Sequence, residues 1–284
     1  MIPSAFDYLK PSTVEDAVAA LAEAGDEAKV LAGGQSLIPV LRLRMAAPSV
    51  LIDLGGLAQL RGVRVLDDVL AIGAMTTHAE VASSDAVRTD APLLAAAAGG
   101  IGDRQVRHLG TLGGALAHAD PAGDLPAVAV ALEAELVVAG PSGRRTVPAR
   151  DFFVDYFTTA LAPEELLVEV RVPRLPAWGA HYEKFHRTAQ SWATVGVAAA
   201  VCRTNGVISH ARVALTNVGP CPVRAVAVEQ ALVGADATVE TVAAAAEHAA
   251  EGTSPTSDLA ASAEFRQHLA RVLTRRAVTA AAGL

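Results

Sequence analysis

Two glycine pairs, each beside a hydroxyl side chain, are the residues of this chain best suited to hold an anion. The first pair lies in Ala32-Gly33-Gly34-Gln35-Ser36, and the second lies in Thr111-Leu112-Gly113-Gly114-Ala115. Because glycine has no Cβ, it takes a positive φ readily, and successive backbone N–H groups then point into one concavity that favours an anion. Ser36 and Thr111 add hydroxyl donors. The two copies of this pattern predict a site for two phosphates.

The second glycine pair precedes residues that complete such a site. Asp120-Pro121-Ala122-Gly123-Asp124 leads into an apolar run of good helix formers, Leu125 to Ala134. Asp124 is placed to fix a hydroxyl or to cap the helix over this run, and the positive end of the helix dipole would attract a phosphate. A third pair, Gly55-Gly56, has no Ser or Thr beside it and is interpreted as an ordinary turn.

Length and composition exclude several classes of protein. The 284 residues exceed one ordinary core and predict two domains, and 52% apolar residues exclude a mainly disordered chain. A net charge of −7 without any basic tract argues against a nucleic-acid surface. The N-terminus lacks the pattern of a signal peptide, and charges interrupt the longer apolar stretches. A soluble, cytoplasmic protein without a membrane span is therefore expected.

The cysteine content limits the redox groups that this chain can carry. Cys202 and Cys221 are the two cysteines, and they do not form a CxxC motif. A conventional iron–sulfur cluster needs four thiolates, so the chain alone cannot hold one. Both residues are interpreted as free thiols in a reducing compartment.

The elements that position the glycine pairs are predicted from periodicity and capping. Ser12 and Glu15 resemble a capping box before a helix, and Lys29-Val30-Leu31 reads as a buried strand that leads into the first glycine pair. A capped helix is predicted to start near Thr77, with His78 on the surface. The other elements predicted in this half are helices over 14–24, 37–45 and 92–98, a strand over 50–54, and a hairpin of 64–66 with 69–72.

The pattern in the second half of the sequence predicts strands first and helices after them. A hairpin is expected over 135–147 and a strand over 165–172, and the proline pair Pro173 and Pro176 marks the best boundary. Four aromatic residues between 152 and 157 form either a local core or one wall of a cofactor site. Beyond the boundary, strands are predicted over 180–185, 195–203 and 207–216, and helices over 223–233, 239–251 and 261–282. This order favours an antiparallel sheet backed by helices.

Taken together, these motifs resemble those of the FAD-binding subunits of molybdenum hydroxylases. The match is to the medium, flavoprotein subunits of the carbon monoxide dehydrogenase type, and the FAD domain of xanthine dehydrogenase is a more distant relative. The resemblance covers essentially the whole chain. The stretches that carry it are 32–36, 111–115, 120–126, 182–187, 192–194, 215–218 and 265–277.

The resemblance implies an α+β fold with two domains. Residues 1–176 would form a split FAD-binding domain of two α+β halves, of the PCMH-like type. Residues 177–284 would form a smaller domain with a three-stranded antiparallel sheet and a helical bundle.

The resemblance also implies a set of FAD-binding residues, with no catalytic residue and no metal ligand among them. Two loops would wrap the pyrophosphate, Asp124 would hold the adenosine end, Lys184 would lie in the flavin site, and Trp192 would pack against the isoalloxazine. Lys184 alone is also consistent with a solvated strand residue. The residues implied for the two loops are Ala32, Gly33, Gly34, Gln35, Ser36, Leu37, Thr111, Gly113, Gly114 and Ala115.

Three positions depart from the family pattern. Ala115 replaces the usual Asn or Asp, Gln35 replaces a common His, and Ser191 replaces an Asp. These departures put the flavin contacts near Ala115 and Ser191 in question. Neither GxGxxG nor GxxxxGK occurs, so neither an ordinary Rossmann site nor a P-loop is supported.

The main functional hypothesis is an electron-transfer subunit. A molybdopterin-containing large subunit would oxidise the substrate, a small subunit with 2Fe-2S clusters would carry electrons, and FAD here would collect them for NAD, a quinone or oxygen. The resemblance implies a dimer of heterotrimers. One alternative is a self-sufficient flavin oxidoreductase, for which His118, His181 and His186 are the available bases. Another is a non-redox scaffold that has lost FAD.

Overall fold

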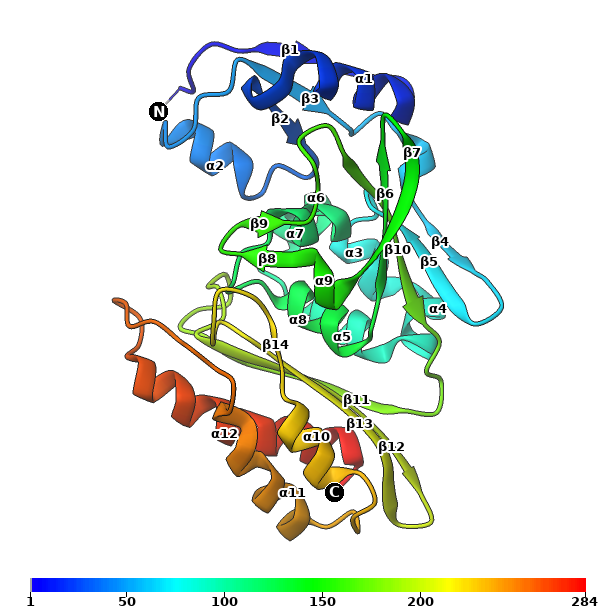
Figure 1. Cartoon of the computed structure of the whole chain (residues 1–284), viewed down its shortest axis with the longest axis vertical. Coiled ribbons are helices and arrows are strands. Elements are labelled where there is room, and N and C mark those ends of the chain that lie inside the picture. The colour runs from blue at the N-terminus through cyan, green and yellow to red at the C-terminus, as the bar shows by residue number, and fades with distance from the viewer. Residues whose placement is uncertain (1) are drawn as a thin grey trace.

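The computed structural model describes residues 2–284 as three units stacked along the long axis of the molecule (Figure 1). The N-terminal unit lies at one end, a middle unit built on a five-stranded sheet comes next, and a C-terminal unit lies at the other end. Within residues 2–284, no helix has the length and apolar character needed to cross a membrane.

The N-terminal unit is a small parallel sheet of order β1-β3-β2 with two helices. Its elements are β1 (Asp7–Leu9), α1 (Val14–Ala24), β2 (Ala28–Leu31), α2 (Leu37–Arg42) and β3 (Val50–Asp53). The predicted capping box of α1 is wrong by one residue. Thr13 is the N-cap and accepts from the backbone N–H of Asp16 at 3.0 Å, because its extended backbone aims the hydroxyl at that amide. Ser12 instead donates to the Asp16 carboxylate.

The middle unit is an antiparallel sheet of order β4-β5-β10-β6-β7 with helices around it. Its strands are β4 (Val63–Val65), β5 (Val69–Gly73), β6 (Glu135–Gly140), β7 (Gly143–Pro148) and β10 (Leu166–Pro173), with a separate pair β8 (Phe153–Asp155) and β9 (Thr158–Thr159). Its helices are α3 (His78–Ser83), α4 (Asp85–Asp90), α5 (Pro92–Gly99), α6 (Arg104–Leu109), α7 (Leu112–His118), α8 (Asp124–Ala131) and α9 (Ala149–Phe152). Both predicted hairpins are confirmed.

The C-terminal unit is an antiparallel sheet of order β11-β12-β13-β14 covered by helices on one face. Its elements are β11 (Gly179–Phe185), β12 (Val195–Thr204), β13 (Val207–Thr216), β14 (Val223–Arg224), α10 (Val226–Leu232), α11 (Val239–Ala246) and α12 (Ala263–Ala282). The three predicted long strands are confirmed. The helix start predicted at Val223 is wrong, because Val223 and Arg224 pair with Leu215 and Ala214 as a short fourth strand.

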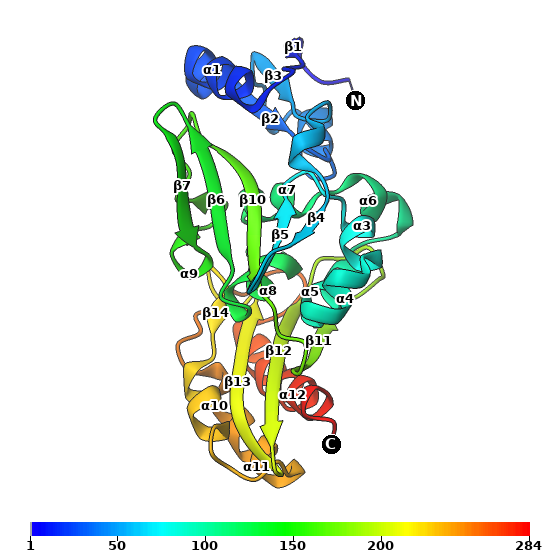
Figure 2. The ribbon, with the colours of Figure 1, turned by 90° about the vertical axis from the view of Figure 1, so that its right-hand side faces the viewer.

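Helices α5 and α8 fill the space between the middle and C-terminal sheets (Figure 2). Every residue of α8 is buried, because one side of this helix faces α5 and another faces β12 and β13. Ala198, Ala200 and Ala214 of the C-terminal sheet belong to the same apolar core as these helices. The small alanine side chains let the two sheets and the helix layer approach closely.

Helix α7, which the sequence predicts as a loop, packs directly on the end of β5. The backbone N–H of Gly113 donates to the Ala74 carbonyl at 2.8 Å. A Cβ at residue 113 would lie 2.5 Å from the Ala74 Cβ and 2.8 Å from its carbonyl oxygen. Gly113 is therefore required by this close contact.

We predict that Gly113→Ala destabilises the chain by about 1–3 kcal/mol, because the added methyl group overpacks the contact with Ala74. The matched control is Gly99→Ala, also in a helix, where the new Cβ would meet only the Ala82 Cβ at 3.8 Å. Gly99→Ala is expected to be neutral or stabilising by about 0.5–1 kcal/mol. Urea unfolding of both variants measures the difference, and equal stabilities would contradict the packing of α7.

His78, predicted to lie on the surface, is buried at the start of α3 with 4% of its surface exposed. Its ring fills the space beside Gly110, where a Cβ would lie 2.8 Å from the ring Cδ2. Burial, and then the positive charge of Arg107, lower the pKa of His78 to about 4. The sequence failed here because the polar pattern of α3 does not reveal that α6 and the second glycine segment cover this face.

We predict that the free energy of unfolding decreases as the pH falls from about 6.5 to about 4, because His78 is neutral in the folded chain. In this window the unfolded state binds a proton that the folded, neutral imidazole does not, and below it both states are protonated. The loss amounts to about 3 kcal/mol for a pKa difference of this size. His78→Gln should flatten the dependence of the free energy of unfolding on pH, whereas His186→Gln, at an exposed side chain, should not. Identical pH slopes for His78→Gln and the wild type would contradict a buried neutral imidazole.

Candidate functional site

The first glycine segment is a tight loop between β2 and α2 with free backbone donors. Gly34 has φ +71°, as predicted for an anion-binding loop, and the Gln35 amide donates back to the Gly33 carbonyl at 3.1 Å. Within residues 2–284, the backbone N–H groups of Gly33, Gly34, Gln35 and Ser36 donate to no protein acceptor. The Ser36 side chain makes no capping bond at the start of α2. Four successive amides are therefore available to an anionic ligand.

The second glycine segment has a different conformation from the one predicted. Gly113 and Gly114 do not have positive φ, because both lie in the first turn of α7. Their N–H groups are already used: Gly113 donates to Ala74, and Gly114 donates to the Thr111 hydroxyl at 3.1 Å. Leu112 likewise donates to Thr76. The prediction of a second nest of amides is thus wrong, and Thr111 is an N-cap.

The two glycine segments nevertheless lie against each other. A Cβ on Gly33 would stand 2.2 Å from the Leu109 carbonyl oxygen and 2.7 Å from the Gly110 Cα. A Cβ on Gly114 would stand 3.3 Å from the Ala32 Cβ. The lack of side chains at these positions lets the backbone of the first loop rest on the end of α6 and the start of α7, which brings Ala32–Leu37 and Thr111–Ala115 into one region.

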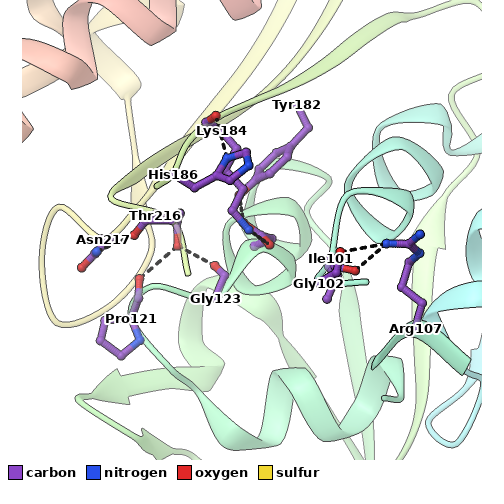
Figure 3. Close-up of polar contacts among 12 residues, drawn as sticks. Ile101, Gly102, Arg107, Pro121, Gly123, Tyr182, Lys184, His186, Thr216 and Asn217 are labelled. Carbon is purple, nitrogen blue, oxygen red and sulfur yellow. Dashed lines mark hydrogen bonds and ion pairs between the residues drawn. The ribbon is translucent and has the colours of Figure 1, made fainter. Parts of the chain in front are cut away.

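Asp124 and Lys184 form a second group, at the junction of α8 and β11. The Lys184 Nζ lies 2.8 Å from one carboxylate oxygen of Asp124, and the Tyr182 hydroxyl donates to the other at 2.6 Å. The Lys184 side chain is 10% exposed and that of Asp124 is 5% exposed, so Lys184 is not a solvated strand residue. Burial, and then the Asp124 carboxylate, raise the pKa of Tyr182 well above its ordinary value. Figure 3 shows Tyr182 and Lys184 together on this strand.

Trp192 lies beside the far end of α7. Its ring centroid is 6.5 Å from that of His118, and the His118 ring is 5.3 Å from that of Phe157. Trp192 is 53% exposed and Phe157 is 57% exposed, so the side chains of both residues are accessible to a ligand. The Asp120 carboxylate is 3.8 Å from the His118 Nε2, and burial raises the pKa of Asp120.

The four aromatic residues near residue 155 divide between the two interpretations left open. Phe152 and Phe153 are buried and pack edge to face, so they belong to the core. Tyr156 and Phe157 are exposed, and Phe157 lies beside His118. Sequence alone could not separate the pairs, because the change from buried to exposed occurs along the short strand β8, which leads from one pair to the other.

The three histidines considered as bases have different surroundings. His118 lies next to Trp192, His181 contacts Glu183 at 2.9 Å, and His186 is exposed with its Nδ1 3.3 Å from the Lys184 carbonyl oxygen. Within residues 2–284, no group of three or more His, Cys, Asp or Glu side chains is arranged to hold a metal ion.

Sequence reasoning missed two polar residues that connect the parts of this site. Tyr182 pairs with Asp124, and Thr216 donates from β13 to the Gly123 carbonyl at 2.5 Å (Figure 3). Both lie in stretches that carry the family resemblance, and this was the available signal. Their roles depend on residues far away in the chain, which no local pattern encodes.

The residues present fit FAD. Four free amides of the first loop offer donors for a pyrophosphate, and α7 leads from there to His118 and Trp192. The half-exposed indole offers an apolar face for an aromatic ring, and Lys184, on β11, places a cation at the start of α8. An extended cofactor whose pyrophosphate is joined through a flexible linker to a flat ring matches this order.

Comparison with known families identifies both parts of the chain. Residues 4–175 match the family described as FAD binding domain in molybdopterin dehydrogenase. Residues 180–281 match the CO dehydrogenase flavoprotein C-terminal domain.

Relatives of known activity match along nearly their full length. The carbon monoxide dehydrogenase medium chain of Hydrogenophaga pseudoflava is 43% identical, over 99% of this chain and 98% of that protein. Subunit alpha of the 6-hydroxypseudooxynicotine dehydrogenase complex of Paenarthrobacter nicotinovorans is 38% identical, over 99% of this chain and 96% of that protein.

A solved structure confirms the fold. The structure of carbon monoxide dehydrogenase from Hydrogenophaga pseudoflava, in a form that lacks the Mo-pyranopterin moiety, contains a chain that matches with a TM-score of 0.96. The two chains are 45% identical, and the match covers 99% of this chain and 98% of that one. The chain therefore belongs to the family of FAD-binding medium subunits of molybdenum hydroxylases, and it is an oxidoreductase subunit with FAD as its cofactor.

Proposed function

We propose that this chain takes electrons from an iron–sulfur subunit and passes them through FAD to NAD, a quinone or oxygen. The observation that carries the proposal is the row of groups from the four free amides of the first loop, along α7, to His118 and Trp192. This row offers binding groups for an extended cofactor. Substrate oxidation is assigned to a molybdopterin-containing large subunit, with a 2Fe-2S small subunit between them.

The two glycine segments are assigned different tasks at the pyrophosphate. The amides of Gly33–Ser36 would donate to phosphate oxygens, and the Ser36 hydroxyl would add a further donor. Gly113 and Gly114 would act through their lack of side chains, since α7 must approach both Ala74 and Ala32. Ala115 and Leu37 complete the same region.

Asp124 is assigned to the flavin end of the site together with Lys184 and Trp192. The adenosine and the isoalloxazine lie at opposite ends of an extended FAD, whereas Asp124 and Lys184 are 2.8 Å apart. The two residues therefore serve the same part of the cofactor. Because the family resemblance implies that Lys184 lies in the flavin site, we propose the flavin end for Asp124 as well, in place of the adenosine role that the resemblance implies. The Asp124 carboxylate, on α8, holds the Lys184 ammonium in place through this ion pair.

The chemistry supplied by bound FAD is the acceptance of electrons singly or in pairs and their release to a second acceptor. The chain's own residues would set the conditions for it. The Lys184 ammonium would stabilise negative charge on the reduced ring, and the indole of Trp192 would cover one face and exclude water. His118, between Trp192 and Phe157, would line the edge of this region.

We also propose the division of the chain at residues 1–176 and 177–284 and its assembly as a dimer of heterotrimers. The connection between β10 and β11 supports this boundary, because the two strands belong to different sheets. The core that α8 shares with the C-terminal sheet packs the two domains against each other.

The direct test of this function is anaerobic reduction of the purified complex with the substrate of its molybdenum subunit. Bleaching of the FAD absorbance, then reoxidation with NAD⁺, a quinone or oxygen added separately, is the expected result. A complex that turns over with its FAD remaining oxidised would contradict electron transfer through this chain.

We predict that Gly34→Ala weakens FAD binding by tenfold or more in the assembled complex. Gly34 has φ +71°, and a Cβ there would meet the Ile38 Cδ1 at 2.7 Å, so the loop that carries the four amides must shift. Gly25→Ala is the matched control, because Gly25 has φ +57° with nothing within 4 Å of a new Cβ. Fluorescence of released FAD measures retention. Equal retention in the two variants would remove the first loop from the cofactor site.

We predict that Lys184→Met lowers the reduction potential of the bound flavin. A buried cation favours the anionic reduced form, and losing about 1.4 kcal/mol of that stabilisation corresponds to roughly 30 mV for a two-electron couple. Lys29→Met, at an exposed strand residue, is the control and should leave the potential unchanged. Spectroelectrochemical titration of the holo-complexes gives both values, and an unchanged potential in Lys184→Met would place Lys184 away from the flavin.

A further inference from the structure

Asn217 lies in the turn after β13, where it contacts two separate parts of the site. Its backbone N–H donates to the Pro121 carbonyl at 2.8 Å, and its side-chain Nδ2 donates to the Ala193 carbonyl at 2.7 Å. Pro121 belongs to the turn that precedes α8, and Ala193 comes directly after Trp192. Figure 3 shows Asn217 beside Pro121 and Thr216. One residue therefore ties the loop of Trp192 to the middle unit.

The residue before Asn217 fixes the position of this contact. Thr216 is fully buried, and its hydroxyl lies 2.5 Å from the Gly123 carbonyl oxygen and 3.0 Å from that of Pro121. The end of β13 is thus fastened to the turn at 121–123. Asn217 itself has φ +61°, a conformation that Asn tolerates better than other side chains with a Cβ.

Hydrogen bonds hold the backbone of the loop that carries Trp192 but leave the indole exposed. Thr194 donates its N–H to the Phe185 carbonyl at 2.8 Å, and its carbonyl accepts from the buried Arg266 at 2.5 Å. Gln190, within the loop, donates to the Asp103 carboxylate. Trp192 has 53% of its surface exposed, so packing alone does not fix the indole. The Asn217 side-chain amide binds the carbonyl of Ala193, the residue that follows Trp192.

We propose that Asn217 is a positioning residue for Trp192. Its side-chain amide holds the Ala193 carbonyl, which turns the adjacent indole toward His118 at the end of α7. The role at the cofactor rests on the proposed function, in which Trp192 covers one face of the flavin. The hydrogen bond from the Asn217 side chain to the Ala193 carbonyl, called the clamp below, is a contact within the chain and does not depend on the cofactor.

Two substitutions remove the clamp in different ways. Asn217→Gly keeps the positive φ and deletes the amide, and Asn217→Asp keeps the shape but places a carboxylate oxygen against the Ala193 carbonyl oxygen. Asn205→Gly is the matched control, because Asn205 also has positive φ, at +53°, but lies in the β12–β13 hairpin. If only the residue-217 variants loosen Trp192, the effect cannot be attributed to a substitution at a positive φ.

The first experiment monitors Trp192 in the purified chain without cofactor. The sequence contains two tryptophans, so Trp178→Phe leaves Trp192 as the single reporter. Asn217→Gly and Asn217→Asp should increase acrylamide quenching of Trp192 and make the Thr194 amide exchange about fivefold faster, as expected for one lost hydrogen bond. Asn205→Gly should change neither. Unchanged quenching and exchange in both residue-217 variants would overturn the clamp.

The second experiment tests the link to the cofactor in the FAD-loaded complex. The visible circular dichroism of the flavin should change in Asn217→Gly and remain as in the wild type in Asn205→Gly. An unchanged flavin spectrum together with a loosened Trp192 would overturn the role at the cofactor. If the wild-type complex holds no FAD, the proposed function fails, whereas the Trp192 measurements still decide the clamp.

Discussion

The contact between the backbone of the first loop and the turn that joins α6 to α7 is the constraint on which the site depends. A side chain on Gly33 would overlap the Leu109 carbonyl, so this contact holds the N-terminal unit against the middle unit. Within the middle unit, a side chain on Gly113 would overlap Ala74, so that contact holds α7 on the end of β5. Among residues 2–284, the amides of Gly33–Ser36 find no protein acceptor. The glycines thus build the site chiefly by allowing backbone segments to touch, and the free donors are a consequence of that packing.

The ion pair of Asp124 and Lys184 makes the corresponding connection at the other end. Asp124 begins a helix that is buried between two sheets, and Lys184 comes from the first strand of the C-terminal sheet. Removing one partner of such a pair typically costs about 3–5 kcal/mol, because the other charge stays buried alone. Tyr182 occupies the second carboxylate oxygen. The pair therefore holds α8, which lies between the two sheets, against β11. It also places the Lys184 ammonium in the site.

The C-terminal unit completes the site from a distance. Its strand β13 ends at Thr216 and Asn217, which hold the turn before α8 and the loop of Trp192 together. None of these residues offers a substrate pocket or a metal site. This arrangement agrees with a subunit whose relatives are parts of dehydrogenases named for compounds as different as carbon monoxide and 6-hydroxypseudooxynicotine.

Much of the fold and the outline of the site could be predicted from the sequence. Periodicity and turn residues located both hairpins and the three long C-terminal strands, because these elements depend on neighbours in the chain. The two glycine segments and the residues that resemble a known family identified FAD. Local patterns failed where a helix replaced a loop at 112–118, and where Val223 paired with Leu215 in place of starting a helix.

The sequence by itself determined the residue types of the site and the family to which the chain belongs. Only the tertiary structure decided the position and the contacts of each residue. It separated Gly34, which needs its positive φ, from Gly113, which needs room beside Ala74. It also placed Asp124 with Lys184, sixty positions away, and buried His78 under the second segment. Burial, close contact and pairing arise between distant segments, so they become defined only when the chain has packed.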